Sequence, residues 1–244
     1  MDEKWFFGIS LCIEFKYPQC AELYSKLIWA LSNSDIDQVI HLLSTLADLI
    51  SDSTKILVRM YEENNPHYFY NRVRLYFKGY LNNDNIPNGL YFGNETVPRV
   101  YAGGSAAQSP IIHLFDVLLG VKHEDLDKYI MTEGNPAVTE KQISYMLEMR
   151  NYIPTEPREF LKTVSANLRL REAISNLKND LATKAYNNCI YALKEFREKH
   201  IQIVSLYVIS QSRKGEKERG TGGTDLIKFL KHNKEETLDC VIYK

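Results

Sequence analysis

The chain has 244 residues, of which 44% are hydrophobic and 25% are charged, and this globular composition argues against a disordered protein. The length predicts one large domain over residues 1–244. Lysine and arginine total 30 against 31 aspartate and glutamate residues, so the net charge of −1 offers no positive field for a nucleic acid or an anionic membrane. No apolar run approaches the roughly 20 residues of a bilayer span, and the acidic residues near the N-terminus are unlike a secretory signal. These features predict a soluble, cytoplasmic protein.

Apolar residues recur with helical periodicity along almost the whole chain, and alternating β-branched runs between tight turns are missing. The sequence therefore predicts an all-α fold. In chain order, the expected helices cover residues 4–31, 34–62 with a cap from Ser34 and Asp37, 68–81, 105–119 or 109–119, 124–130, a short element after 139, 156–164, 168–177, 180–209 and 225–232. Residues 82–104 and 210–224 are rich in glycine, asparagine, proline or charge, and we expect them to be functional loops.

The cysteines and histidines show no metal-binding spacing. Cys12, Cys20, Cys189 and Cys240 form no Cys-x-x-Cys pair, and the histidines form no His-Glu-x-x-His pattern, so a zinc site is disfavoured. We interpret the four cysteines as reduced thiols. Cys12 and Cys189 lie within apolar helical stretches, where a small buried side chain is expected.

The expected helix over residues 180–209 carries a continuous apolar stripe with a histidine in it. The members of this stripe recur at steps of three or four: Tyr186, Cys189, Ile190, Leu193, Phe196, His200, Ile203, Val204 and Tyr207. A neutral imidazole directed into an apolar cavity is what a haem iron takes as its axial ligand, because burial keeps the ring unprotonated. From spacing alone, however, a lone histidine on an apolar face is more often a core residue. Both interpretations of His200 remain open at this point.

Two stretches of small residues admit either a functional or a structural interpretation. Residues 220–224 offer three glycines and two hydroxyls, which allow an anion or polar substrate to approach the backbone or simply connect two helices. Residues 102–109 admit close approach of a ligand or of a neighbouring helix. Composition alone does not decide between these uses.

Two arginines are separated by one residue. Arg72 and Arg74 cannot share a helix face, so we expect one to point to solvent and the other inward. A buried guanidinium needs a carboxylate, either from the protein or from a substrate. Asp116 and Arg197 are candidates for an internal pair of this kind.

Several stretches of the chain, taken together and in order, carry a resemblance to a known family. They are Phe6–Ser10, Asn65–Pro66 followed by Phe69–Arg74, Ala102–Ser109 running into Phe115–Gly120, Met149–Pro154, His200–Val204 and Gly220–Leu226. The chain resembles the haem-containing large domain of the indoleamine 2,3-dioxygenase family over nearly its whole length. The resemblance implies a helical bundle that encloses a pocket for haem b, with a long helix that carries the proximal histidine.

The resemblance assigns roles to individual residues. His200 would be the proximal iron ligand, and Asp116 and Arg197 would pair beneath the haem. The implied substrate-binding residues are Phe6, Phe7, Ser10, Phe69, Arg74, Ala106 and Thr221, and the implied cofactor-binding residues are Gly104, Ser105, Asp116, Arg197, Gly222 and Gly223. Arg74 would pair with the substrate carboxylate, and Thr221 would contact the substrate ammonium or a haem propionate as its loop closes.

The activity implied by the resemblance is insertion of both atoms of O2 across the indole C2–C3 bond of L-tryptophan, which gives N-formylkynurenine, the first step of the kynurenine pathway. An electron donor would reduce ferric haem. Ser10 is a poor general base, so no catalytic side chain is implied beyond the haem iron and the residues that position the substrate. Substrate, O2 and reductant are thus the expected partners, without nucleic acid or membrane.

One departure from the family pattern concerns the N-terminus. Relatives usually carry a smaller helical domain before the stretch that matches Trp5 to Ser10, and here four residues precede it. That domain covers part of the distal pocket, so the chain is a fragment, a minimal version, or a unit covered by a partner chain or dimer. Alternatives to the dioxygenase are an inactive haem-binding sensor or regulatory protein, a haem enzyme acting differently on a related indole, and an all-α scaffold without cofactor.

Overall fold

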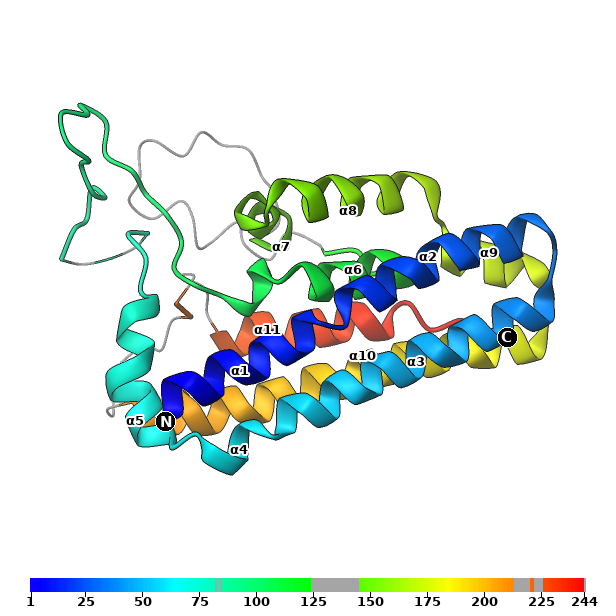
Figure 1. Ribbon diagram of the computed structural model, residues 1–244, viewed down its shortest axis with the longest axis horizontal. Helices are drawn as coiled ribbons and strands as arrows, with labels where there is room; N and C mark the ends of the chain where they lie inside the picture. The colour runs from blue at the N-terminus through cyan, green and yellow to red at the C-terminus, as the bar shows by residue number, and fades with distance from the viewer. Residues whose placement is uncertain (82, 84, 124–144, 213–219, 222–225, 244) are drawn as a thin grey trace.

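The computed structural model describes residues 1–81, 83, 85–123, 145–212, 220–221 and 226–243, and these residues fold into a layered set of α-helices (Figure 1). The helices are α1 (Asp2–Glu14), α2 (Tyr17–Ser32), α3 (Ile36–Val58), α4 (Met60–Glu63), α5 (Pro66–Tyr68), α6 (Pro110–Leu119), α7 (Tyr145–Met149), α8 (Thr155–Asn167), α9 (Leu170–Leu177), α10 (Asp180–Tyr207) and α11 (Leu226–Leu238). Within the described ranges no strand forms beyond an isolated bridge between Leu90 and Arg99, which confirms the all-α prediction.

The core lies between α3 and α10, which run side by side along most of their lengths, with α2 and α11 packed against this pair (Figure 1). The apolar stripe predicted on the long helix is the buried face of α10. Fully buried side chains of α10 and α3 meet there, namely Tyr186, Cys189, Ile190, Leu193, Leu43, Leu46 and Ile50. Burying each aliphatic side chain of this kind stabilises the fold by roughly 1.5–3 kcal/mol.

The helix expected over residues 4–31 is two helices. Pro18 stands at the start of α2 and lacks a backbone N–H, and its ring would clash with the carbonyl of Glu14 in a continuous helix. The chain therefore ends α1 at Glu14 and begins α2 at Tyr17. The expected burial of Cys12 is wrong, because its position on α1 faces solvent, whereas Cys189 is buried as predicted.

The helix expected over 34–62 starts and ends differently. Asp35, rather than Ser34, caps α3, because its carboxylate accepts a hydrogen bond from the Gln38 amide at 3.0 Å. Ser34 adopts a left-handed conformation with a φ of 55°. The helix also breaks at Arg59, where the short α4 begins.

The segment expected as a regular helix over 68–81 is irregular. After α5 the chain forms a π-helix over Phe69–Val73 and a 3₁₀-helix over Arg74–Phe77, and it leaves the helical conformation at Lys78. Gly79 then passes so close to the backbone of residues 101–103 that a side chain would not fit. Wide turns of the π type occur frequently at functional sites.

The remaining elements follow the sequence prediction with shifted ends. A 3₁₀-helix over Ala106–Gln108, capped by Ser105, precedes α6, and α6 ends at Gly120 with a left-handed φ of 74°. A 3₁₀-helix over Arg150–Tyr152 links α7 to α8, and α11 extends beyond His232. The helix expected near 124–130 lies outside the described residues, as does the start of the element expected after 139, whose described part is α7. None of the described helices is long and apolar enough to cross a bilayer.

Candidate functional site

An aromatic cluster joins the start of α1 to the irregular segment after α5. The ring centroid of Phe6 lies 5.6 Å from that of Phe7, 4.9 Å from Phe69 and 5.3 Å from Phe77. Phe69 also meets Tyr207 of α10 edge to face, with centroids 5.8 Å apart. The three phenylalanines proposed for one wall therefore lie together. Phe77 was missed, although it lies within the helix expected over residues 68–81.

Ser10 lies one turn after Phe6 on α1 and is exposed. Its hydroxyl donates a hydrogen bond to the Phe6 carbonyl at 3.0 Å. Phe7 is 48% exposed, so this side of the aromatic cluster is open to solvent. A serine hydroxyl occupied in this way has no neighbouring base to deprotonate it in the described contacts, and it is suited to binding rather than to proton abstraction.

Arg72 and Arg74 face in different directions, as their spacing predicted. Arg72 is exposed and lies over the Tyr68 ring at 5.4 Å, whereas Arg74 is buried, with its guanidinium 5.4 Å from the centroid of Tyr70. Tyr70 in turn packs against a cluster formed by Val204 of α10, Val208 directly after this helix, and Leu230 of α11. The π-helix thus directs Arg74 inward, towards the end of α10 that follows His200.

The small residues of 102–109 meet the start of the second glycine-rich stretch. The Thr221 hydroxyl donates to the Gly104 carbonyl, and Gly103 lies so close to the Phe77 and Thr221 carbonyls that a side chain would not fit. The Ser105 hydroxyl accepts from the Ala107 amide at 3.2 Å, which fixes the turn on which the exposed Ala106 lies. Gly104, Ser105, Ala106 and Thr221 therefore lie beside the aromatic cluster. Gly222 and Gly223 are outside the described residues.

A buried ion pair connects α6 to α10. The carboxylate of Asp116 is fully buried and pairs with the guanidinium of Arg197, which is 8% exposed. Arg197 also donates to the Asn233 carbonyl and to the Thr237 hydroxyl on α11. The sequence interpretation of Asp116 and Arg197 as an internal pair is confirmed. Breaking such a pair costs roughly 3–5 kcal/mol, because it leaves an uncompensated buried charge.

Two residues that the sequence analysis did not single out, His123 and Glu236, extend this ion pair. His123 lies between two carboxylates, with Nε2 at 3.0 Å from Asp116 and Nδ1 at 2.6 Å from Glu236. Although burial acts to lower the pKa of His123, these carboxylates outweigh it and raise the pKa to about 9. Burial likewise acts to raise the pKa of Asp116, but Arg197 and His123 hold it below its usual value. Glu236 and His123 are distant in sequence and carry no shared motif, so only the fold reveals them.

His200 lies three residues after Arg197 on α10 and is half-buried. Burial, followed by the nearby charge of Arg197, lowers the pKa of its imidazole to about 4, so the ring is neutral at neutral pH and keeps a lone pair. No hydrogen bond or ion pair joins it to another described residue. A neutral imidazole among apolar neighbours such as Ile203 and Val204 fits the axial ligand that a haem requires.

The candidate site therefore has two parts connected by α10. The ion-pair cluster of Asp116, Arg197, His123 and Glu236 precedes His200 along the helix, and the aromatic cluster reaches the helix after it, at Tyr207. In Figure 1 this end of α10 lies beside α5, which it contacts. Phe6, Phe7 and Phe69, three of the expected substrate-binding residues, thereby lie near this end of α10.

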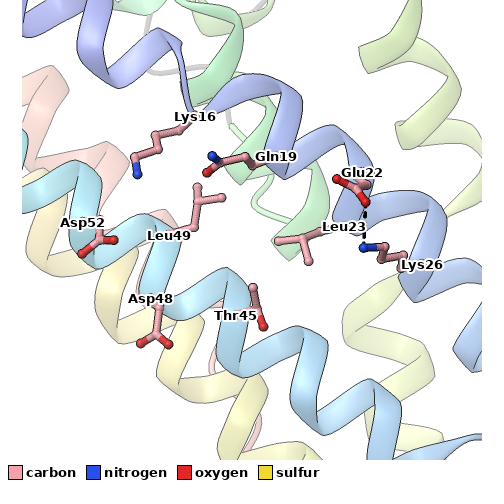
Figure 2. Close-up of a pocket in the computed structure, with 9 residues that line it drawn as sticks. All are labelled: Lys16, Gln19, Glu22, Leu23, Lys26, Thr45, Asp48, Leu49 and Asp52. Carbon is pink, nitrogen blue, oxygen red and sulfur yellow. Dashed lines mark ion pairs between the residues drawn. The ribbon is translucent and has the colours of Figure 1, made fainter.

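A separate groove lies between α2 and α3. Figure 2 shows its lining, which is mostly charged and includes the Glu22–Lys26 ion pair at 2.7 Å. None of the residues predicted for the site lines it. Its charged lining differs from the apolar surroundings of His200, so we do not assign it to the candidate site.

These features define a helical protein whose long central helix presents a neutral histidine between a buried ion pair and an aromatic cluster. The profile of the indoleamine 2,3-dioxygenase family matches residues 1–240, and the chain belongs to this family. It is 32% identical to indoleamine 2,3-dioxygenase of Saccharomyces cerevisiae over 272 residues, which cover 98% of this chain and 59% of that protein. Indoleamine 2,3-dioxygenase 1 of Mus musculus is 32% identical, with 96% and 58% covered.

A human relative shows the same level of identity. Indoleamine 2,3-dioxygenase 2 of Homo sapiens is 32% identical over 209 residues, which cover 80% of this chain and 48% of that protein. The matched part of the chain thus spans between 48% and 59% of the length of these relatives.

Proposed function

We propose that the protein is a haem dioxygenase that acts on L-tryptophan and forms N-formylkynurenine. The observation that carries the proposal is the neutral, half-buried imidazole of His200, one turn after the Arg197–Asp116 pair, in a chain of this family. When bound, haem b supplies the oxygen chemistry, after reduction by an electron donor. A cytoplasmic location is part of the proposal.

The chain's own residues hold the haem and orient the indole. His200 is the iron ligand, and Arg197 with Asp116 supports the helix that presents it. Gly104 and Ser105 would line the haem edge, where the absence of a large side chain would let a flat macrocycle approach the backbone. Gly222 and Gly223 belong to the same proposed haem contact.

The distal residues select an aromatic amino acid. Phe6, Phe7 and Phe69 offer ring faces and edges to an indole, and Phe77 extends this wall. The guanidinium of Arg74 receives the substrate carboxylate, while Ala106 leaves room for the substrate and Thr221 serves the ammonium group. Ser10 lies one turn from Phe6 and contributes a hydroxyl to the same side.

A second candidate is a haem-binding protein of the same family without turnover. The observation that favours it is the exposed side of the aromatic cluster, where Phe7 is 48% exposed. A partner chain or a second copy that covers this side would restore exclusion of water, which the oxygen chemistry needs.

The test is reconstitution with haem, followed by reduction in air and addition of L-tryptophan. We expect a Soret band, and then growth of the near-ultraviolet absorption of N-formylkynurenine. His200→Ala should lose the Soret band of bound haem, whereas His41→Ala, at an exposed histidine of α3, should retain it. Haem binding without product would favour the second candidate. Unchanged haem binding by His200→Ala would refute the ligand assignment.

A further inference from the structure

The segment Met149–Pro154 carried the family resemblance but has no role in the proposed chemistry. It forms the end of α7 and the 3₁₀-helix Arg150–Tyr152, which packs beside the 3₁₀-helix Ala106–Gln108. A small buried cluster joins these elements, in which Met146 and Met149 contact Ala107, with Ala102 packed against it. The segment therefore touches both ends of the stretch 102–107, which contains the proposed haem-edge residues.

His113 of α6 is completely buried, and its two ring nitrogens form hydrogen bonds with Ala107 and Arg150. Its Nε2 lies 2.7 Å from the Ala107 carbonyl oxygen, and its Nδ1 lies 3.3 Å from Nε of Arg150. A carbonyl only accepts and a guanidinium only donates, so Nε2 must carry the proton and Nδ1 must be the acceptor. The two contacts thus require one tautomer of a neutral ring and form a chain of hydrogen bonds from Arg150 through His113 to Ala107.

The other end of the same stretch is held from the same 3₁₀-helix. The Ala102 amide donates to the Tyr152 hydroxyl at 2.8 Å. Between the two anchors, the Gln108 side chain donates to the Gly103 carbonyl at 2.9 Å. The Gly104 amide also donates to the Phe77 carbonyl at 3.0 Å, so the backbone from 102 to 107 is held by this bond, by the 3₁₀ turn at Ala106–Gln108 and by these side chains, without a regular ladder.

From these contacts we propose that Arg150 and His113 are positioning residues, which fix the 102–107 backbone for a ligand through the Ala107 carbonyl. Arg150 and His113 belong neither to the aromatic cluster nor to the ion pair, so they would act on a ligand only through the backbone that they hold. The identity of the ligand as haem rests on the proposed function. The claim that Arg150 and His113 organise residues 102–107 does not depend on the proposed function, and this organisation can be measured in the protein without haem.

The first measurement is amide hydrogen exchange of residues 103–107 in the haem-free protein. Arg150→Met keeps the length of the side chain and removes the donor, and we expect exchange about tenfold faster, the effect of losing one charge-assisted hydrogen bond. His113→Leu should have a similar or larger effect. Arg169→Met, at an arginine 78% exposed on its side chain, is the matched control and should leave these amides unchanged.

Two comparisons separate positioning from a merely structural role. His113→Gln offers an amide donor and an oxygen acceptor, so it should restore slow exchange, whereas His113→Leu should not. The double variant Arg150→Met/His113→Leu should be no faster than His113→Leu alone, because both act through one chain of hydrogen bonds. Additive effects, or unchanged exchange in Arg150→Met, would overturn the proposal. Arg150 is partly exposed, so its variant should fold even where the His113→Leu variant does not.

Haem titration gives the second measurement. In Arg150→Met we expect haem affinity about tenfold weaker than in the wild type, with the urea unfolding midpoint nearly unchanged. Wild-type affinity in a variant whose amides exchange faster would overturn the positioning role and leave the proposed function intact. Failure of the wild-type protein itself to bind haem would refute the proposed function, and the exchange data would still decide whether Arg150 and His113 organise the segment.

Discussion

At the scale of single residues, three histidines show how the surroundings decide what one side chain type does. His123 lies between two carboxylates and is held as a cation, whereas burial keeps His200 and His113 neutral, each with a pKa lowered to about 4. The neutral rings differ in turn: His113 uses both nitrogens in hydrogen bonds, and His200 bonds to no other described residue. A neutral imidazole without such bonds is the one suited to a metal.

Arg74 and Arg72 provide a matched pair for testing substrate recognition. Arg74→Lys keeps a charge but loses the planar fork that binds a carboxylate with two parallel bonds, so we expect KM for L-tryptophan to rise roughly 10- to 100-fold while haem is retained. Arg72→Lys, at the exposed neighbour, should leave KM unchanged. Steady-state kinetics and the Soret band measure both quantities. Loss of haem from Arg74→Lys would reassign Arg74 to the structure of the pocket.

At the scale of elements, the irregular segment after α5 owes its place to hydrogen bonds made by other helices. The Tyr207 hydroxyl of α10 lies 2.9 Å from the Met60 carbonyl and 2.7 Å from the Asn64 carbonyl, and its proton is shared between them. From α1, the Asp2 carboxylate accepts from the Asn65 amide at 2.6 Å. Asn65 then caps α5, so the start of the π-helix is fixed by α1 and α10 together.

Tyr207→Phe tests this arrangement. The variant leaves two buried carbonyls without their donor, so we expect the free energy of unfolding to fall by about 1–3 kcal/mol. Because the π-helix orients Phe69 and Arg74, KM for L-tryptophan should rise as well. Tyr191→Phe, on the same helix but 50% exposed, should change neither quantity. Urea denaturation measures the stability, and an unchanged midpoint in Tyr207→Phe would show that the shared hydrogen bond is unimportant.

Periodicity predicted what depends on neighbours in the sequence. The long helix, its buried stripe and the glycine that ends α6 follow from spacing, because helical faces and left-handed caps are local properties. The helix break before Pro18 could have been predicted from the proline, but the sequence analysis missed it. The sequence could not predict the π-helix at Phe69–Val73 or the contact of His123 with Glu236, because each depends on elements that meet only in the folded chain.

At the scale of the whole molecule, the buried charges add a polar connection between helices that the apolar core already packs together. Asp116 comes from α6, Arg197 from α10 and Glu236 from α11, while His123 follows α6. His232 adds a further contact with Glu236 at 3.1 Å. Two buried carboxylates thereby meet two cations, which offsets much of the cost of burying them. The position of α10, and of His200 on it, depends on this balance of charge.

This balance predicts how stability varies with pH. The pKa of His123 is about 9 in the folded state and near 6.5 in the unfolded chain, so its contribution is complete below about pH 6.5 and is lost as the pH rises through 9. His113 and His200 have a folded pKa of about 4, so they favour the unfolded chain increasingly as the pH falls from about 6.5 towards 4.

The free energy of unfolding should therefore be greatest near pH 6.5 and decline on both sides, by up to about 3 kcal/mol for each histidine. His123→Gln removes the alkaline decline because glutamine does not titrate, and His113→Gln should reduce the acid decline while keeping its two hydrogen bonds. Urea denaturation from pH 4 to 10 measures the curve. A wild-type curve that stays level between pH 7 and 9 would contradict a charged His123, whereas a matching curve would establish that this cation helps to hold α6, α10 and α11 together.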